Sequence, residues 1–161
     1  MILGIIILAL VTLQRLGELW LSNRNTRRLL AQGAREYGQS HYPLIVAVHA
    51  LWLVVLWWLA PGRHVFAFWL LIYILLELAR IWVLATLGRR WTTRIIVLTG
   101  APLVRRGPYR FVNHPNYVVV IGEIAVLPLV FGLWQVTLVF SLLNAAVLTI
   151  RIRDENRALG R

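Results

Sequence analysis

Long apolar runs dominate this chain of 161 residues. Three of them extend over Ile2 to Leu21, Pro43 to Ala60 and Val65 to Leu87, and a fourth extends over Val118 to Ile150. A helix crosses the hydrocarbon core of a bilayer with about 20 mostly apolar residues. Charged residues make up only 14% of the chain, whereas about a quarter of a soluble domain is charged. The sequence therefore predicts one all-α integral membrane domain over residues 1–161.

The fourth run is too long for a single untilted span, and Pro128 and Gly132 interrupt it. We interpret it as a helical hairpin with one arm near 115–130 and the other near 133–157. The hairpin brings the predicted number of transmembrane helices to about five. Residues 1–87 would supply the three N-terminal spans, and residues 88–161 a loop, the hairpin and a basic tail.

The net charge of +11 comes from arginines, and most of them lie between the apolar runs. So basic a soluble domain would suggest nucleic acid, but charge that brackets membrane segments fits orientation and anionic lipid headgroups instead. Short arginine-rich loops stay in the cytoplasm. We expect residues 22–42, residues 88–117 and the C-terminal tail on the cytoplasmic face, with the N-terminus outside. No nucleic acid and no obligate protein partner is expected.

Metal ligands form no recognisable set in this sequence. Cysteine is absent, which excludes disulfides, thiolate metal sites and cysteine nucleophiles. The four histidines, His41, His49, His64 and His114, show no metal-like pairing. We therefore expect no metal site.

Two pairs of opposite charges lie inside the predicted spans. An ionisable group in a span costs about 2.5 to 3.5 kcal/mol on insertion scales, so it needs a partner or a function. Arg15 with Glu18, and Glu77 with Arg80, are three residues apart and can pair on one helical face. We expect both pairs to hold helices together.

Glu123 has no basic residue three or four positions away in its own span. The expected partner is Arg151 or Arg153 on the returning arm of the hairpin, where Glu155 shares a helical face with Arg151. One interpretation is a structural clamp across the hairpin. The other is an active-site carboxylate beside a fixed cation.

The loop before the hairpin shows signs of local structure and is not a simple linker. Residues 94–98 and 103–104 read as two short extended pieces around a turn. Asn113 or His114 can cap the following helix, with Pro115 at its first position. Its free N–H groups and positive dipole end would then face this loop.

Tyr109, His114 and Tyr117 add aromatic and imidazole faces within the same short segment. Such faces can stack on a purine-like ring. The alternative is that the tyrosines belong to an interfacial aromatic belt.

The segment Gly107-Pro-Tyr-Arg-Phe-Val-Asn-His-Pro-Asn-Tyr117, followed by Glu123, Arg151 and Glu155, resembles the C-terminal signature of the isoprenylcysteine carboxyl methyltransferase superfamily. The similarity covers roughly residues 90–157. It implies a membrane methyltransferase that takes S-adenosylmethionine from the cytosol and a lipophilic substrate from the bilayer. The cofactor-binding residues that it implies are Leu103, Val104, Tyr109, His114, Pro115, Asn116, Tyr117 and Glu155.

The resemblance also implies that Arg151 holds the acceptor group, and Glu123 is our hypothetical base for a phenol or enol acceptor. The chain departs from the usual pattern at Asn113 and Asn156, and it ends soon after Glu155. It looks most like small bacterial members that O-methylate alkylpyrones or alkylresorcinols, which implies a bacterial cytoplasmic membrane. Two alternatives stay open: a related membrane reductase that uses NADPH, and a non-enzymatic scaffold or transporter.

Overall fold

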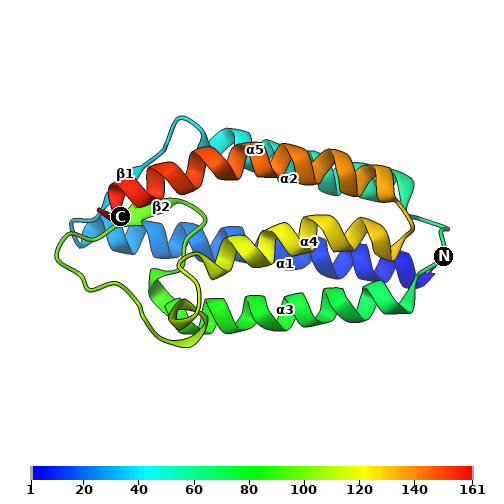
Figure 1. The fold of residues 1–161 in the computed structure, drawn as a ribbon, viewed down its shortest axis with the longest axis horizontal. Helices are drawn as coiled ribbons and strands as arrows, with labels where there is room; N and C mark the ends of the chain where they lie inside the picture. The colour runs from blue at the N-terminus through cyan, green and yellow to red at the C-terminus, as the bar shows by residue number, and fades with distance from the viewer. Residues whose placement is uncertain (1, 161) are drawn as a thin grey trace.

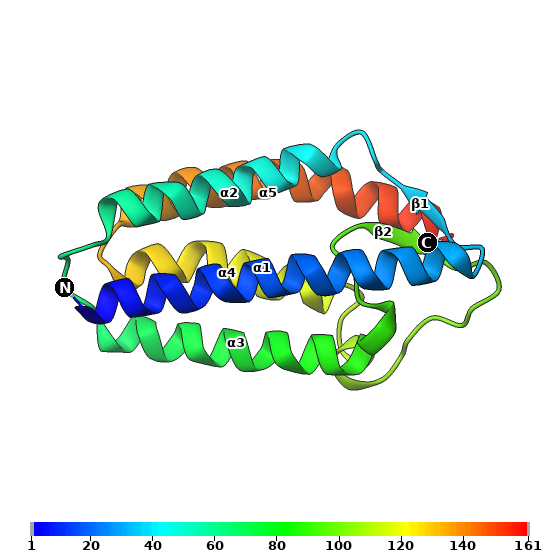
Figure 2. The ribbon, with the colours of Figure 1, turned by 180° about the vertical axis from the view of Figure 1, so that it is seen from behind.

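A computed structural model describes residues 2–160 of the chain as a bundle of five helices with a small sheet at one end. The elements are α1 (Ile2–Ala31), β1 (Arg35–Tyr37), α2 (Tyr42–Leu59), α3 (Ala67–Leu87), the 3-10 turn η1 (Gly88–Arg90), β2 (Ile95–Val97), the 3-10 turn η2 (Gly107–Arg110), α4 (Pro115–Val130) and α5 (Trp134–Ala158). The helices lie side by side (Figure 1). The sheet, the long loop and the C-terminus gather at the end opposite the N-terminus, as the view from behind also shows (Figure 2).

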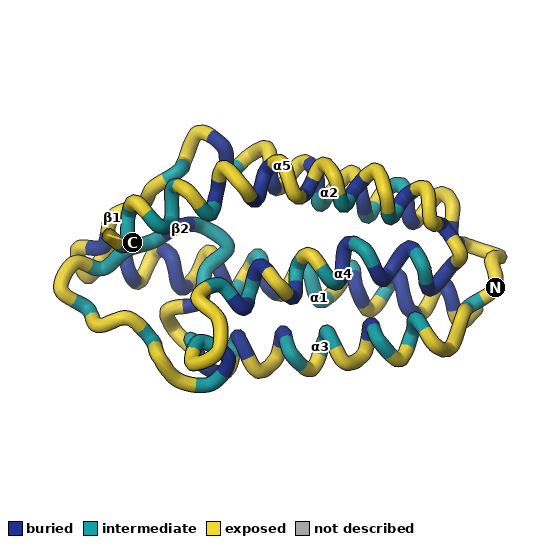
Figure 3. The backbone as a smooth tube through the Cα atoms, viewed as in Figure 1, coloured by how far each residue is buried: buried dark blue, intermediate teal, exposed yellow. Residues whose placement is uncertain are grey.

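The outer surface of the bundle is apolar. Large side chains such as Leu10, Trp58, Leu71 and Leu142 are more than half exposed on it, and exposed positions follow the outer faces of the helices (Figure 3). A soluble monomer rarely exposes apolar surface on this scale. Four helices, α1, α2, α3 and α5, are long and apolar enough to cross a membrane. The chain is therefore a multi-pass membrane protein, and the predicted all-α fold with about five helices is confirmed.

The fifth helix, α4, has 16 residues and lies largely inside the bundle. It packs between α3 and α5. Gly122 permits a close approach to α3, because a Cβ at this position would lie 2.7 Å from the Leu76 side chain. The core side chains Ile124 and Leu127 are fully buried on α4. Neighbouring helices therefore cover most of this shorter helix, although Val118 and Ile121 stay exposed.

The predicted hairpin between α4 and α5 is confirmed. Its turn is held by backbone hydrogen bonds from Phe131 and Leu133 to the carbonyl of Pro128. Gly132 adopts φ +69, a left-handed conformation that glycine enters without a steric cost. The tight turn aligns α4 and α5 in opposite directions, so the start of α4 lies beside the end of α5.

The sheet joins two loops that are far apart in the sequence. β1 and β2 pair antiparallel, with Glu36 opposite Ile96. Arg94 Nη1 donates to Glu36 Oε1 at 2.7 Å, and this hydrogen bond raises the pKa of Arg94. The extended piece at 94–98 is confirmed as β2, but the one at 103–104 is wrong, because these residues form no strand. They lack a partner segment among residues 2–160, and an unpaired strand leaves its backbone groups without bonds.

The first helix is longer than the predicted span. It was expected to end near Leu21, but it continues to Ala31. Ser22 Oγ lies 2.7 Å from Thr93 Oγ1, and Asn25 Nδ2 donates to the Trp91 carbonyl at 2.8 Å. The polar last turns of α1 therefore bind the loop that contains the candidate site.

Candidate active site

A cavity opens among the long loop, the start of α4 and the end of α5, and we call it the loop cavity. Its volume is about 190 Å³. The predicted site residues that line it are Leu103, Val104, Tyr109, His114, Asn116, Tyr117, Arg151 and Glu155. Pro115 and Glu123 do not line it. Pro115 instead occupies the first turn of α4, as expected.

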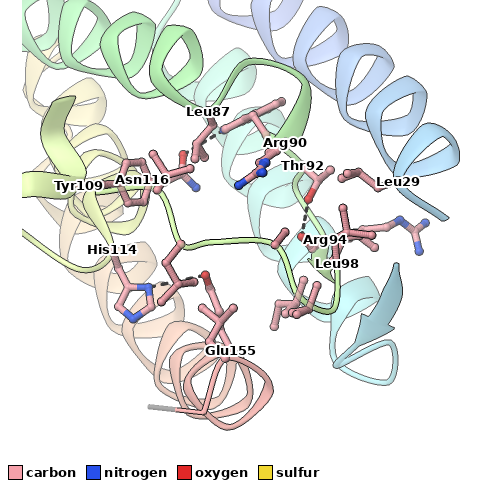
Figure 4. Close-up of a pocket in the computed structure, with 18 of the residues that line it drawn as sticks. Leu29, Leu87, Arg90, Thr92, Arg94, Leu98, Tyr109, His114, Asn116 and Glu155 are labelled. Carbon is pink, nitrogen blue, oxygen red and sulfur yellow. Dashed lines mark hydrogen bonds and ion pairs between the residues drawn. The ribbon is translucent and has the colours of Figure 1, made fainter. Parts of the chain in front are cut away.

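Glu155 is the carboxylate of the loop cavity. The Tyr117 hydroxyl donates to Glu155 Oε2, and Glu155 Oε1 lies 3.7 Å from His114 Nδ1. His114 Nε2 lies 3.0 Å from Asn156 Oδ1. Figure 4 shows His114 and Glu155 beside each other at the cavity wall, with their contact as a dashed line. One oxygen of Glu155 therefore has no hydrogen bond from any residue that the structure describes.

Ring faces form another part of this wall. The rings of His114 and Tyr117 are stacked, with centroids 5.4 Å apart. Tyr109 is half-buried, and its burial, with the nearby Glu155 carboxylate, raises the pKa of its hydroxyl. It therefore stays a neutral hydroxyl at physiological pH. The expected side-chain cap of α4 is wrong, because His114 occupies the capping position without such a bond. Its ring is turned to Tyr117 and Asn156 instead.

Arg151 lies where α5 meets the loop, and it is only 5% exposed. Its Nε donates to the Tyr117 hydroxyl at 2.8 Å, and its Nη2 donates to the Thr93 carbonyl. Tyr117 thus accepts from Arg151 and donates to Glu155. This relay fixes the guanidinium, because each of its bonds has a defined direction.

A second cavity, which we call the membrane cavity, lies among the helices and has a volume of about 260 Å³. Its walls come mainly from α1 and α2, with side chains such as Leu16, Leu19, Ile45 and Leu53. Both cavities share four lining residues: Trp91, Asn116, Tyr117 and Arg151. The loop cavity and the membrane cavity therefore meet at a common wall that includes the fixed guanidinium.

Glu123 lines neither cavity, and its expected pairing with Arg151 or Arg153 is wrong. It is 1% exposed and accepts from Arg15 Nη2 at 2.7 Å and from Arg80 Nε at 2.6 Å. Arg151 binds Tyr117, which lies six residues before Glu123 on α4, so Arg151 is too near the loop to reach Glu123. The residues on α1 and α3 at the depth of Glu123 supply its partners.

These residues belong to an intramembrane charge network that consists of Arg15, Glu18, Arg80 and Glu123. Glu18 pairs with Arg15 at 2.8 Å, as predicted, and with Arg80 at 3.3 Å. The predicted pairing of Glu77 with Arg80 is wrong, because Arg80 turns toward α4. Glu77 accepts from Gln14 at 2.5 Å instead. The network is neutral overall and links α1, α3 and α4.

His49 is a polar residue of the membrane cavity that the sequence analysis did not single out. The available signal was its position inside an otherwise apolar run, between Pro43 and Ala60. His49 has no histidine or acid at a spacing suited to metal binding, so the sequence gives it no metal-ligand pattern. Among residues 2–160, no group of three or more histidines and acids is placed to hold a metal ion.

Residues 69–161 match the isoprenylcysteine carboxyl methyltransferase (ICMT) family. The chain belongs to this family of membrane methyltransferases, and the predicted superfamily is confirmed. The protein YpbQ of Bacillus subtilis is 36% identical, over 96% of this chain and 95% of its own length. A protein of Haemophilus influenzae is 26% identical, over 91% of this chain and 88% of its own length. No solved structure gives a significant match.

Proposed function

We propose that the protein is an S-adenosylmethionine-dependent O-methyltransferase that acts on a lipophilic acceptor from the bilayer. The observation that supports this most is the meeting of two unlike cavities at Arg151 and Tyr117. Methyl transfer needs a polar cofactor and an apolar acceptor brought into line in a water-poor place. The loop cavity, which contains the Glu155 carboxylate and several arginines, suits the cofactor, and the more apolar membrane cavity among the helices suits the acceptor.

The residues of the loop cavity fit the cofactor by their chemistry. S-adenosylmethionine supplies a methyl group on a cationic sulfonium. The free oxygen of Glu155 can accept from a ribose hydroxyl or an ammonium group. Tyr109 and His114 offer ring faces for a purine, and Leu103 and Val104 offer apolar contact.

Arg151 is the proposed holder of the acceptor oxygen. It lines both cavities, and Tyr117 and Thr93 fix its orientation. For a carboxylate acceptor, a fixed cation is enough, because the nucleophile is already ionised. For a phenol or an enol, as in alkylresorcinols and alkylpyrones, a base must also remove or share a proton.

We also place the loop cavity on the cytoplasmic side. The support is the arginine content of the segments at this end of the bundle, which include Arg89, Arg90, Arg105, Arg106 and Arg110. Such short basic segments stay in the cytoplasm, where S-adenosylmethionine is made. The N-terminus then lies outside.

Calorimetry on the purified protein in lipid nanodiscs tests the cofactor assignment. We expect S-adenosylhomocysteine to bind, and Glu155→Ala to weaken it about 10- to 100-fold, the cost of a hydrogen bond to a charged group. The control is Arg153→Ala, two residues away on an exposed face. Binding of NADPH in place of S-adenosylhomocysteine would favour the reductase, for which Arg90 and Arg94 at the cavity would hold the extra phosphate. Binding of neither ligand would favour a scaffold.

The reaction itself is tested with labelled S-adenosylmethionine and a lipid extract. We expect label in a lipid product, and mass spectrometry of that product identifies the acceptor oxygen. Absence of label from every lipid fraction, with S-adenosylhomocysteine bound normally, would contradict the proposed lipid acceptor.

A further inference from the structure

His49 is an ionisable side chain in the middle of α2 that lines the membrane cavity. Polar groups in a membrane span are costly, and they usually face a cavity or a partner. His49 faces the cavity, and the proposed methyl transfer as described above does not use it.

The hydrogen bond of His49 settles which ring nitrogen is free. His49 Nδ1 lies 2.8 Å from the carbonyl oxygen of Ile45, one turn earlier in α2. A carbonyl only accepts, so Nδ1 must hold the hydrogen and donate it. In the neutral ring, Nε2 then has an unshared lone pair. Among residues 2–160, the hydrogen bond at Nδ1 is the only one that the His49 ring makes.

The register of α2 against α5 places this nitrogen near the common wall. His41 Nδ1 lies 3.3 Å from Asp154 Oδ2, so these two residues are level. His49 follows His41 by eight residues and Arg151 precedes Asp154 by three. At about 1.5 Å per residue, the Cα atoms of His49 and Arg151 therefore differ in depth by about 7.5 Å. Side chains on a helix lean toward its N-terminus. His49 therefore leans toward the loop, and Arg151 leans into the membrane, each toward the other.

Of the arginines that line the membrane cavity, only Arg151 has no carboxylate from residues 2–160 bound directly to it. Arg15 and Glu18 on α1 and Arg80 on α3 line the membrane cavity, and Glu123 on α4, which does not line it, acts on His49 through its charge. These four belong to the intramembrane charge network and neutralise one another. Arg151 on α5 binds an uncharged hydroxyl and a carbonyl instead. A small ring with an ionisable hydroxyl can thus lie between a free imidazole nitrogen and an uncompensated guanidinium.

We infer that His49 Nε2 is the general base that removes the proton from a phenol or enol hydroxyl of the lipid acceptor, an inference that rests on the proposed function. The acceptor O–H bond breaks, its proton moves to Nε2, and its electron pair stays on the oxygen. The oxygen bonds to the methyl carbon while the carbon–sulfur bond breaks, and that electron pair goes to sulfur, which leaves a neutral thioether. His49 then releases the proton to water. His49 takes the role that our sequence analysis assigned to Glu123, which binds Arg15 and Arg80 and does not line the cavity.

The test compares two acceptors in nanodiscs, 5-pentadecylresorcinol and palmitate, with labelled S-adenosylmethionine. His49→Gln keeps a polar side chain of similar reach but removes the base. We expect methylation of the resorcinol to fall about 100-fold or more, the usual contribution of a general base, with unchanged binding of S-adenosylhomocysteine. The matched control is His64→Gln, which changes an exposed histidine in the α2–α3 loop.

The dependence of the rate on pH gives a second readout. With the wild type, methylation of the resorcinol should rise with pH as Nε2 loses its proton, and His49→Gln should lose this rise. Equal rates for wild type and His49→Gln would overturn the inference. A wild type that methylates palmitate but not the resorcinol would also overturn it and leave the proposed function standing. A wild type that methylates neither acceptor nor any lipid would overturn the proposed function itself.

Discussion

The protein contains two clusters of acids and arginines that differ in how completely their bonds are used. In the intramembrane charge network, Glu123 and Arg80 are 1% and 3% exposed and bind each other directly. At the common wall, Arg151 is almost as buried, but Glu155 has a quarter of its side chain exposed and one oxygen without a hydrogen bond. The same residue types can therefore hold helices together or bind a ligand. A polar atom that lies beside a cavity and has no hydrogen bond is what suits the second cluster to binding a ligand.

Removal of one charge from the network should have the largest effect. Glu123→Gln keeps the shape but leaves Arg80 buried beside an uncharged amide. Breaking a buried pair in this way costs about 3 to 5 kcal/mol. We expect a clear fall in the thermal unfolding midpoint in detergent, while Glu155→Gln, the same substitution at the open cluster, changes it little.

This experiment also decides the role that the sequence predicted for Glu123. If Glu123→Gln unfolds at the wild-type temperature yet no longer methylates, Glu123 takes part in the chemistry. If activity falls only in proportion to the folded fraction, the residue is structural, as its two arginine partners indicate.

An intermediate effect is expected from Arg151→Lys at the common wall. Lysine keeps the charge but cannot donate to Tyr117 and Thr93 from one planar group. We expect the methylation rate to fall about 100-fold, because misplacement of an acceptor by about 1 Å costs that much. Binding of S-adenosylhomocysteine should change only a few-fold. Arg153→Lys, at an exposed position of the same helix, is the matched control, and similar rates for the two variants would remove Arg151 from the reaction.

The smallest effect is expected where an ion pair lies partly in solvent. Glu36→Gln breaks the bond to Arg94 between β1 and β2, but Arg94 keeps its position 4.3 Å over the Tyr42 ring. Partly exposed pairs contribute about 0 to 1 kcal/mol. We expect the unfolding midpoint to shift by a few degrees at most, and less at high salt. A tenfold loss of S-adenosylhomocysteine binding would instead show that this pair positions the loop cavity.

Features that depend on nearby residues could be predicted from the sequence. The lengths of the apolar runs predicted the helices. Pro128 and Gly132 predicted the turn of the hairpin, and its two arms are the helices on either side of that turn. Residues around the turn also determine which ends of α4 and α5 meet. For this reason, His114, Tyr117 and Glu155 come together as expected.

Features that depend on the order of helices in the bundle could not be predicted. Glu123 finds its partners on α1 and α3, which no spacing along the chain reveals. β1 has only three residues, and its pairing with β2 joins segments about 60 positions apart. Residues on all sides of α2 are apolar, so the sequence does not show which of its faces points into the bundle. The orientation of His49 could therefore not be predicted.

The match to the methyltransferase family begins at residue 69, after the two helices that form most of the membrane cavity. In the proposed enzyme, most residues that hold the methyl donor therefore lie in the matched segment, whereas most of the wall of the acceptor cavity comes before it. We therefore expect changes in α1 and α2 to alter the preferred lipid more than they alter binding of the methyl donor. The boundary near residue 69 is thus a natural junction for chimaeras, in which the first half of a relative would transfer its acceptor preference.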